Sequence, residues 1–252
     1  MTERALTFGS VAADYERYRP GYPDEVAAEV LAFAGRPIAT ALEIGAGTGK
    51  ATRVLAAHGL RVTASDPDAA MLAELVRHVP DTVRTLQAPF EELPLDTTYD
   101  LVYAAAALHW TRSEGRWERT AALLEPGGVF ASFGAPRDLA DPAVGEALRE
   151  AQSPWVGDIV VPPPDGTPAD SELQWPSTEL SASPLFTDVT QVVIEVRTSV
   201  SAEDYVGLMS TVSAFLVLPP DTRRTALDRV RAALPDEVDV VGDIRLHIAR
   251  RA

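Results

Sequence analysis

The 252-residue sequence contains no cysteine, and Lys50 is the only lysine among its 22 basic residues. The absence of cysteine excludes disulfides and thiolate chemistry and is compatible with a reducing compartment. No apolar run reaches the roughly 20 residues that cross a bilayer, and the N-terminus lacks the basic and apolar regions of a secretory signal. We therefore expect a cytoplasmic protein that has no membrane partner.

Basic clusters are also missing. The chain carries 37 acidic residues against 22 basic ones, which gives a formal net charge of −15. Such a chain repels a phosphate backbone unless its arginines gather in one patch, so we expect no nucleic-acid partner. No acids or histidines are arranged as a metal site, and no oligomeric state follows from the sequence. Frequent alanine and arginine in place of lysine are typical of a GC-rich bacterial genome.

What the sequence does contain, up to residue 134, is an alternation of strands and helices. Strand patterns cover 38–44, 60–66, 83–88, 99–107 and the end of "LLEPGGVFASF", and helical patterns separate most of them. One of these helices is expected to begin at Pro67, since proline is favoured in a first turn. Five strands alternating with helices predict right-handed crossovers and a parallel sheet.

The alternation breaks after residue 134. Residues 135–185 include "VPPPDGTP" and little periodicity, and a long irregular stretch of this kind is usually a lid or a binding loop. Strand patterns return at 188–200 and 238–251, with helical stretches between them. We predict one α/β domain with a Rossmann-like, seven-stranded, mostly parallel sheet, helices on both faces and an inserted lid. Its parts are an N-terminal arm (1–35), a cofactor-binding core (36–134), the lid (135–185) and a C-terminal part of the sheet with a substrate-side helix (186–252).

The stretch "ALEIGAGTGK", residues 41–50, ends a strand in a bend with Gly45, Gly47 and Gly49. Glycine lets the backbone turn tightly and approach a ligand, because it has no Cβ. A dinucleotide-binding bend has the spacing G-x-G-x-x-G. Here the third glycine comes one residue early, and Glu43 is not part of that pattern. A ligand-free turn is the structural alternative.

The segment "EIGAGTG" resembles the first motif of the class I S-adenosylmethionine-dependent methyltransferases. The later segments "QAPFEELP", "YDLVYAAAALHW" and "LLEPGGVFASF" follow in the order found in that family, so the resemblance covers residues 40–134. The tyrosine-rich arm "FGSVAADYERYRPGYP" resembles that of a subgroup containing trans-aconitate methyltransferase and small-molecule enzymes of bacterial secondary metabolism. An amphipathic helix covering the sheet edge is the alternative for the arm.

The resemblance implies S-adenosyl-L-methionine as cofactor and S-adenosyl-L-homocysteine as product. It places the bend around the methionine part, an aspartate on the ribose hydroxyls, and a methionine and the segment after the third strand near the adenine. The cofactor-binding residues implied in this way are Glu43, Gly45, Ala46, Gly47, Gly49, Asp66, Pro67, Met71, Phe90, Glu91, Ala104, Tyr15 and Arg19.

On the acceptor side, His109 is the candidate proton acceptor, because the exit of the fourth strand borders the active site in this family. The alternative is that it hydrogen-bonds to its own loop. His58, His78 and His247 are expected to be structural or surface residues. Trp175 could add aromatic surface to the acceptor pocket. The substrate-binding candidates are Tyr22, His109, Trp110, Trp155, Tyr205 and Met209.

These features predict methyl transfer to a small-molecule acceptor, with oxygen favoured over nitrogen and carbon, in bacterial secondary metabolism. Two alternatives belong to other classes. One is a protein that uses S-adenosylmethionine for a reaction other than methyl transfer. The other is an NAD-dependent oxidoreductase, which the glycine spacing disfavours.

Overall fold

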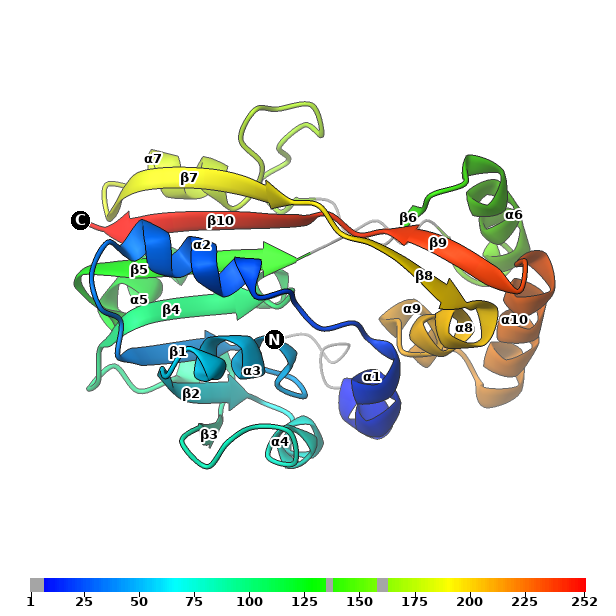
Figure 1. Cartoon of the computed structure of the whole chain (residues 1–252), viewed down its shortest axis with the longest axis horizontal. Coiled ribbons are helices and arrows are strands. Elements are labelled where there is room, and N and C mark those ends of the chain that lie inside the picture. Colours follow the sequence, from blue (N-terminus) through cyan, green and yellow to red (C-terminus); the bar gives the residue numbers. More distant parts are fainter. Residues whose placement is uncertain (1–6, 135–137, 158–162) are drawn as a thin grey trace.

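The computed structural model describes residues 7–134, 138–157 and 163–252. Its main feature is a seven-stranded sheet with the strand order β3-β2-β1-β4-β5-β10-β7 (Figure 1). Neighbouring strands from β3 to β5 are parallel, whereas β10 is antiparallel to both β5 and β7. The predicted seven-stranded, mostly parallel sheet is therefore confirmed. The strands are β1 (Thr40–Ile44), β2 (Arg61–Asp66), β3 (Arg84–Gln87), β4 (Tyr99–Ala105), β5 (Leu124–Gly134), β7 (Phe186–Ile194) and β10 (Ile244–Arg251).

Helices cover both faces of this sheet because each buries an apolar stripe against it. On one face, α2 (Glu25–Ala34) and α3 (Lys50–Ala57) pack on alternate side chains of the strands, including Tyr103. On the other, α5 (Arg116–Leu123) and α7 (Ser177–Ala182) cover a second layer of apolar side chains. This two-sided burial matches the near-continuous apolar runs of the central strands.

The helix after β2 begins later than the sequence pattern predicts. The prediction that it starts at Pro67 is wrong, because α4 runs over Ala69–Leu75. Asp68 is its N-cap, and its carboxylate accepts a hydrogen bond from the amide of Ala70 at 2.8 Å. An aspartate that satisfies a free amide of the first turn is a stronger start signal than a neighbouring proline.

The two strand patterns near the C-terminus are each broken in the middle. Residues 188–200 belong to β7 and β8 (Arg197–Ser201), and 238–251 to β9 (Glu237–Val241) and β10. The breaks lie side by side, where the amide of Gly242 donates to the carbonyl of Val196 at 3.0 Å. Beyond them, β9 and β8 continue into a second sheet with β6 (Asp138–Leu139), in the order β6-β9-β8. Figure 1 shows these paired chains running from the large sheet to the small one.

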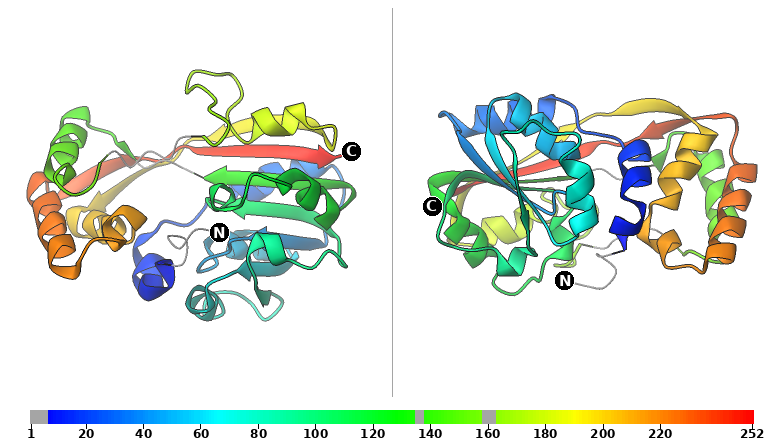
Figure 2. Two further views of the ribbon diagram at one scale, coloured as in Figure 1. Left: turned by 180° about the vertical axis from the view of Figure 1, so that it is seen from behind. Right: turned by 90° about the horizontal axis from the view of Figure 1, so that it is seen from below.

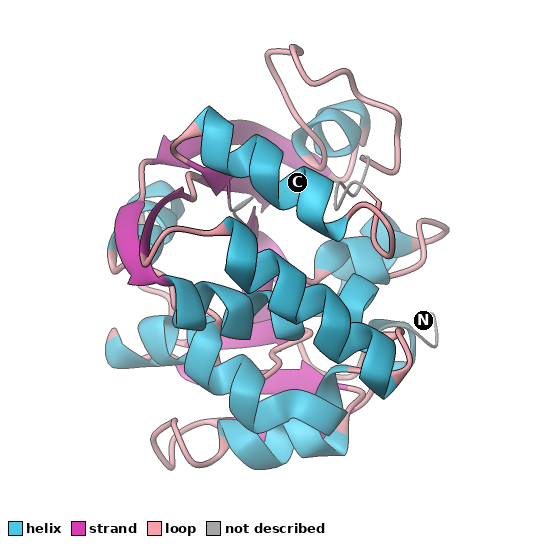
Figure 3. Ribbon diagram, turned by 90° about the vertical axis from the view of Figure 1, so that its right-hand side faces the viewer, coloured by secondary structure: helices cyan, strands magenta, loops and turns pink. Residues whose placement is uncertain are grey.

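Helices form a layer over the second sheet, and Figure 3 shows them from that side of the molecule. The helices are α6 (Pro142–Gln152), α8 (Ala202–Ser210), α9 (Ser213–Leu216) and α10 (Pro220–Ala233). Their apolar side chains make a separate cluster with β8 and β9. Within 135–185, β6 and α6 therefore belong to the second sheet, whereas α7 packs against β7 and β10 of the first.

The N-terminal arm lies between the two sheets. It consists of the short helix η2 (Phe8–Val11) followed by α1 (Ala12–Tyr18). Figure 2 shows α1 between α4, beside the large sheet, and α8, beside the small one. Within the described ranges, no helix has both the length and the apolar character that a membrane span needs.

Candidate functional site

The glycine bend has left-handed backbone at all three of its glycines, with φ angles of 67° at Gly45, 56° at Gly47 and 85° at Gly49. A Cβ at Gly45 would stand 2.5 Å from the Cβ of Ala107, which follows β4. A Cβ at Gly49 would stand 2.8 Å from Leu75 of α4. The bend therefore needs glycine both for its conformation and for its close contacts.

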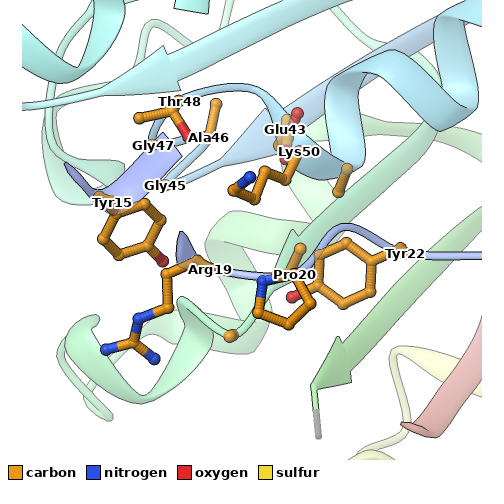
Figure 4. Close-up of a pocket in the computed structure, with 13 residues that line it drawn as sticks. Tyr15, Arg19, Pro20, Tyr22, Glu43, Gly45, Ala46, Gly47, Thr48 and Lys50 are labelled. Carbon is orange, nitrogen blue, oxygen red and sulfur yellow. The ribbon is translucent and has the colours of Figure 1, made fainter. Parts of the chain in front are cut away.

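A pocket opens at this bend, and we call it the glycine-loop pocket (Figure 4). It lies at the carboxyl ends of β1 and β4, where an open α/β sheet usually binds its ligand. The bend, the arm and the exit of β4 all contribute to it. Its lining residues are Tyr15, Arg19, Pro20, Tyr22, Glu43, Gly45, Ala46, Gly47, Thr48, Lys50, Ala51, Ala105 and Ala106.

Glu43 brings a carboxyl group to the wall of this pocket. Its side chain is buried, and Oε2 accepts hydrogen bonds from Thr52 Oγ1 at 2.5 Å and from Tyr103 OH at 2.8 Å. Burial, aided by the nearby Asp66, outweighs these bonds and raises the pKa of Glu43 to about 8. A positive charge placed in the pocket would favour the ionised form of this acid.

Asp66 ends β2 beside the bend, and both of its carboxylate oxygens hold the backbone. Oδ2 accepts from the amide of Gly47 and Oδ1 from the amide of Asp68, each at 2.9 Å. Burial raises its pKa despite these two bonds. Each oxygen keeps a second lone pair, so the group can still accept from hydroxyls. Its neighbour Pro67 accepts a hydrogen bond from Gln87 Nε2 through its carbonyl.

The only lysine of the chain lies in the same pocket. Lys50 Nζ donates to the carbonyl of Glu16 at 2.7 Å and lies 3.4 Å from Glu16 Oε2. The guanidinium of Arg53 also pairs with Glu16, at 3.0 Å. The positive charges of Lys50 and Arg53, in the first turn of α3, are therefore paired with Glu16 of the arm. Lys50 was not among the predicted site residues, although its place directly after the bend could have pointed to it.

Arg19 lines the pocket but directs its charge elsewhere. Its Nε and Nη2 donate to the Thr211 hydroxyl and carbonyl, at 2.8 and 3.1 Å. In Figure 4 its guanidinium points away from the bend. The guanidinium of Arg19 therefore links the arm to the helices of the second sheet, and its cofactor contact stays a prediction. Tyr15 does face the pocket, and the Arg19 guanidinium lies over its ring at 5.2 Å.

The start of the arm covers the same edge of the sheet. The amide of Gly9 donates to Asp68 Oδ2 at 3.0 Å, and the ring of Phe8 meets that of Trp110 edge-on, with centroids 6.1 Å apart. Trp110, a predicted substrate residue, therefore contacts the arm. These contacts are what would keep water from a ligand in the bend.

Several predicted cofactor residues lie next to the pocket rather than in it. Met71, Phe90 and Ala104 have side chains buried in the apolar layers of the fold. Glu91 Oε1 accepts a hydrogen bond from the amide of Arg112 at 2.8 Å, and its Oε2 is buried without a partner. Together with Gly49, which packs against α4, these residues line neither pocket of this edge. The adenine contacts of Met71, Phe90 and Glu91 stay predictions.

A second pocket adjoins the first at Ala106, and we call it the Trp175 pocket. It has a volume of about 220 Å³. Ala106 lines both pockets with its backbone at φ 52°, an uncommon conformation for a residue other than glycine. The lining residues are Ala106, Ala107, Leu108, His109, Ser132, Phe133, Gly134, Trp175, Pro176, Arg245 and His247.

The predicted proton acceptor, His109, lies in the Trp175 pocket, beside the junction with the first. Its ring packs against that of Trp110, with centroids 4.8 Å apart. Burial and, to a smaller extent, the charge of Arg116 lower its pKa. The imidazole is therefore neutral at pH 7, which is the state in which it can accept a proton.

The other predicted substrate residues separate into two groups. Tyr22 lines the glycine-loop pocket and packs edge-on against Phe133, with ring centroids 4.9 Å apart. Trp155, Tyr205 and Met209 instead belong to the apolar cluster of the second sheet. They line neither pocket, because this small sheet needs its own core and α8 turns its apolar side chains into it.

Sequence reasoning missed the residues that come to the Trp175 pocket from the last strand. His247 is buried, and its Nδ1 lies 2.9 Å from Ser177 Oγ. Burial, with the nearby Arg245 charge, lowers its pKa to about 4. The alternation of apolar Ile244, Leu246 and Ile248 signals that 245 and 247 share the opposite face, but not that a pocket lies there. Among the described residues, no group of three or more histidines and acids is placed to hold a metal ion.

Comparisons with known proteins agree with this geometry. A family model described as a methyltransferase domain matches residues 42–132, which contain the bend, β2 and β4. An uncharacterized methyltransferase of Mycobacterium tuberculosis is 33% identical over 233 residues, covering 92% of this chain and 87% of that protein. A trans-aconitate 2-methyltransferase of Deinococcus radiodurans is 36% identical over 103 residues, 38% of each chain.

The fold comparison extends over almost the whole chain. A solved structure from Anaeromyxobacter dehalogenans, assigned as a type II methyltransferase, superposes with a TM-score of 0.61. It is 25% identical and covers 92% of this chain and 98% of that one. The chain therefore belongs to the class I S-adenosylmethionine-dependent methyltransferases, and S-adenosyl-L-methionine is its cofactor.

The residues of the glycine-loop pocket fit this cofactor. The glycines of this pocket leave room for close backbone approach, and the carboxyl group of Glu43 lines it, while Asp66 holds the bend from the side through the amide of Gly47. Of the basic side chains nearby, Lys50 and Arg53 are paired with Glu16, and Arg19 donates to Thr211.

Proposed function

We propose that this protein transfers the methyl group of S-adenosylmethionine to a small molecule held in the Trp175 pocket, with oxygen as the favoured acceptor atom. The observation that carries the proposal is that the two pockets meet at Ala106. A ligand in the second pocket would therefore stand beside a cofactor in the first. A role in bacterial secondary metabolism stays a prediction from the sequence.

The bound cofactor supplies a methyl group activated by the sulfonium. What the protein must add is position: the acceptor atom held about 3 Å from the methyl carbon, in line with the bond that breaks. The bend and Asp66 fix one side of this arrangement, because Asp66 holds the amide of Gly47. The walls around Ala106 and His109 fix the other.

Proton transfer depends on the acceptor. An un-ionised hydroxyl or an ammonium must lose a proton, whereas a carboxylate does not. In the proposed reaction a ring nitrogen of the neutral His109 accepts this proton. His109 suits the role because it lines the Trp175 pocket and has a lowered pKa.

The arm contributes by excluding water. Lys50 and Arg53 bind Glu16, and Asp68 binds the amide of Gly9, so that the arm is attached along one side of the bend. Arg19 attaches its other end to Thr211. We infer that the arm must open for cofactor exchange and close for transfer.

Calorimetry tests the part of the proposal that concerns cofactor binding. We expect S-adenosylhomocysteine to bind and NADH not to bind. Asp66→Ala should weaken binding by about 1.5–3 kcal/mol, the value of hydrogen bonds to a charged group, which is roughly 10- to 150-fold. Asp81→Ala, an exposed acid after α4, is the matched control. Tight binding of NADH with no binding of S-adenosylhomocysteine would favour the oxidoreductase alternative.

Transfer itself is tested by mass spectrometry of acceptors incubated with S-adenosylmethionine. A gain of one methyl group, with equimolar S-adenosylhomocysteine, supports the proposal. Turnover of an acceptor without methyl gain would instead support the use of the cofactor for another reaction.

A further inference from the structure

The Trp175 pocket gathers polar groups that the rest of the described chain leaves unused. The indole Nε1 of Trp175 is buried and has no hydrogen-bond partner. The hydroxyl of Ser132 and the guanidinium of Arg245 also form no hydrogen bond or ion pair with another described residue. Buried donors in native proteins nearly always have partners, so an orphan here points to a ligand.

All of these unused groups can donate a hydrogen bond, and no carboxylate accompanies them. Among the described residues that line the pocket, none is aspartate or glutamate. The acid on α7, Glu179, is engaged behind the pocket by Trp117 Nε1 at 2.8 Å and by Arg116 at 3.4 Å. In a chain with a net charge of −15, an acid-free pocket beside an arginine is unusual.

His247 adds to this polarity. Its Nδ1 faces Ser177 Oγ, which leaves Nε2 as the ring nitrogen available to the pocket. The pocket also offers a flat apolar wall from Trp175. The ring of Phe133 packs against Tyr22 and Tyr103 on the opposite face of the sheet. A ligand with a planar apolar body and one acceptor-rich end would use both features.

We propose that the Trp175 pocket selects acceptors that carry an anionic group, a carboxylate or a phosphate, held by the Arg245 guanidinium and the Trp175 indole N–H. An arginine can grip either group with two parallel hydrogen bonds. Arg245 is here a specificity-determining residue and takes no part in methyl transfer. The inference rests on the proposed function, because it treats this pocket as the acceptor site.

Benzoate is the probe that tests the proposal, since it combines a planar body with a carboxylate. Calorimetry with the full chain saturated with S-adenosylhomocysteine compares benzoate, the neutral isostere benzamide, and phenyl phosphate. We expect benzoate to bind at least tenfold more tightly than benzamide. If phenyl phosphate binds better still, the same anion site is supported with phosphate as its natural group.

Two variants separate the contributions of the donors. Arg245→Gln removes an exposed charge and should weaken benzoate binding at least tenfold, and Trp175→Phe, which keeps a ring but removes the N–H, should weaken it about three- to tenfold. Neither should change benzamide binding by more than about twofold. Arg224→Gln on α10 and Trp155→Phe in the second core are the matched controls, and thermal melting confirms that each variant folds.

The outcomes distinguish the two proposals. If S-adenosylhomocysteine binds every variant equally but benzoate and phenyl phosphate bind no better than benzamide, the anion site is refuted and the proposed function stands. The same conclusion follows if Arg245→Gln leaves benzoate affinity unchanged. If S-adenosylhomocysteine itself does not bind, the proposed function fails first.

Discussion

The two pockets at the carboxyl edge of the sheet differ in charge and in origin. The glycine-loop pocket is built around one bend and an acid, Glu43, that is protonated in the free protein and would ionise beside a cation. The Trp175 pocket has no acid among its described lining residues and carries an arginine, Arg245. Under the two proposals, a single sheet edge presents opposite electrostatic preferences on either side of one residue, Ala106.

The largest effect is expected at Gly45, where the bend contacts Ala107 of the Trp175 pocket. We expect Gly45→Ala to weaken S-adenosylhomocysteine binding on the order of 10²-fold or more, because a left-handed alanine costs about 1–2 kcal/mol and its Cβ would overlap Ala107. Gly59→Ala is the control, since Gly59 has φ 84° but nothing within 4 Å of its added Cβ. Calorimetry on both variants makes the comparison. Equal affinities would show that the close contact at Ala107 is not needed.

The second prediction tests proton transfer to His109 in the Trp175 pocket. We expect His109→Ala to lower kcat on the order of 10²-fold for a hydroxyl or amine acceptor, with cofactor affinity unchanged. The wild-type rate should be constant above the ordinary histidine pKa and fall only at lower pH, because the pKa of His109 is lowered and the base must be unprotonated. His78→Ala, in the turn after α4, is the control. An unaltered kcat with the fold intact would leave positioning alone as the source of catalysis.

The third prediction concerns Glu43 in the glycine-loop pocket. Because the pKa of Glu43 is raised to about 8, the free protein holds a proton there that a cationic ligand must displace. Affinity for S-adenosylmethionine should therefore rise between pH 6 and 8, by up to about tenfold per unit. Glu43→Gln should remove this dependence in calorimetry across the same range.

The same shift has a consequence for stability. A carboxyl whose folded pKa exceeds its unfolded value binds more protons when folded, so its contribution falls as pH rises from about 4.5 towards 8. Denaturant unfolding should show Glu43→Gln losing less stability than the natural chain over this interval. The opposite order would mean that the acid is already ionised in the free protein.

The smallest expected effect concerns the attachment of the arm to the second sheet. Thr211→Val keeps the shape of the side chain but removes the hydroxyl that accepts from Arg19. We expect cofactor affinity to fall about three- to tenfold, in line with roughly 1 kcal/mol for one hydrogen bond. Thr225→Val on α10, whose hydroxyl bonds only within its helix, is the control. Unchanged affinity would mean that the arm closes without this link.

The parts of the fold that sequence predicts best are those with a local signal. The parallel sheet followed from strand patterns that alternate with helical ones, the bend followed from three glycines, and the family resemblance lay in the same segment. The start of α4 was misplaced by two residues, because the capping role of Asp68 is visible only from its hydrogen bond to Ala70. The second sheet was not anticipated: Gly242 and Asp243 are residues that strands disfavour, but nothing local marks the break at 195–196 with which they pair.

Among the predicted site residues too, those with a local sequence signal share a pocket, whereas those without one do not. Glu43, Gly45, Ala46, Gly47 and Tyr15 do line one pocket, because all but the last are contiguous. Tyr205 and Met209 were among the predicted substrate residues, but they lie in the apolar core of the second sheet, which the sequence did not predict.

Local chemistry by itself determined that this chain would make a tight glycine turn after an acid, at the end of a buried strand. Only the tertiary structure decided which side chains share the neighbouring space: Ser177 and His247, 70 residues apart, touch because α7 crosses the face of β10. Contacts of that kind depend on how the layers pack, and the residues that packing brings together show no periodic pattern in the sequence.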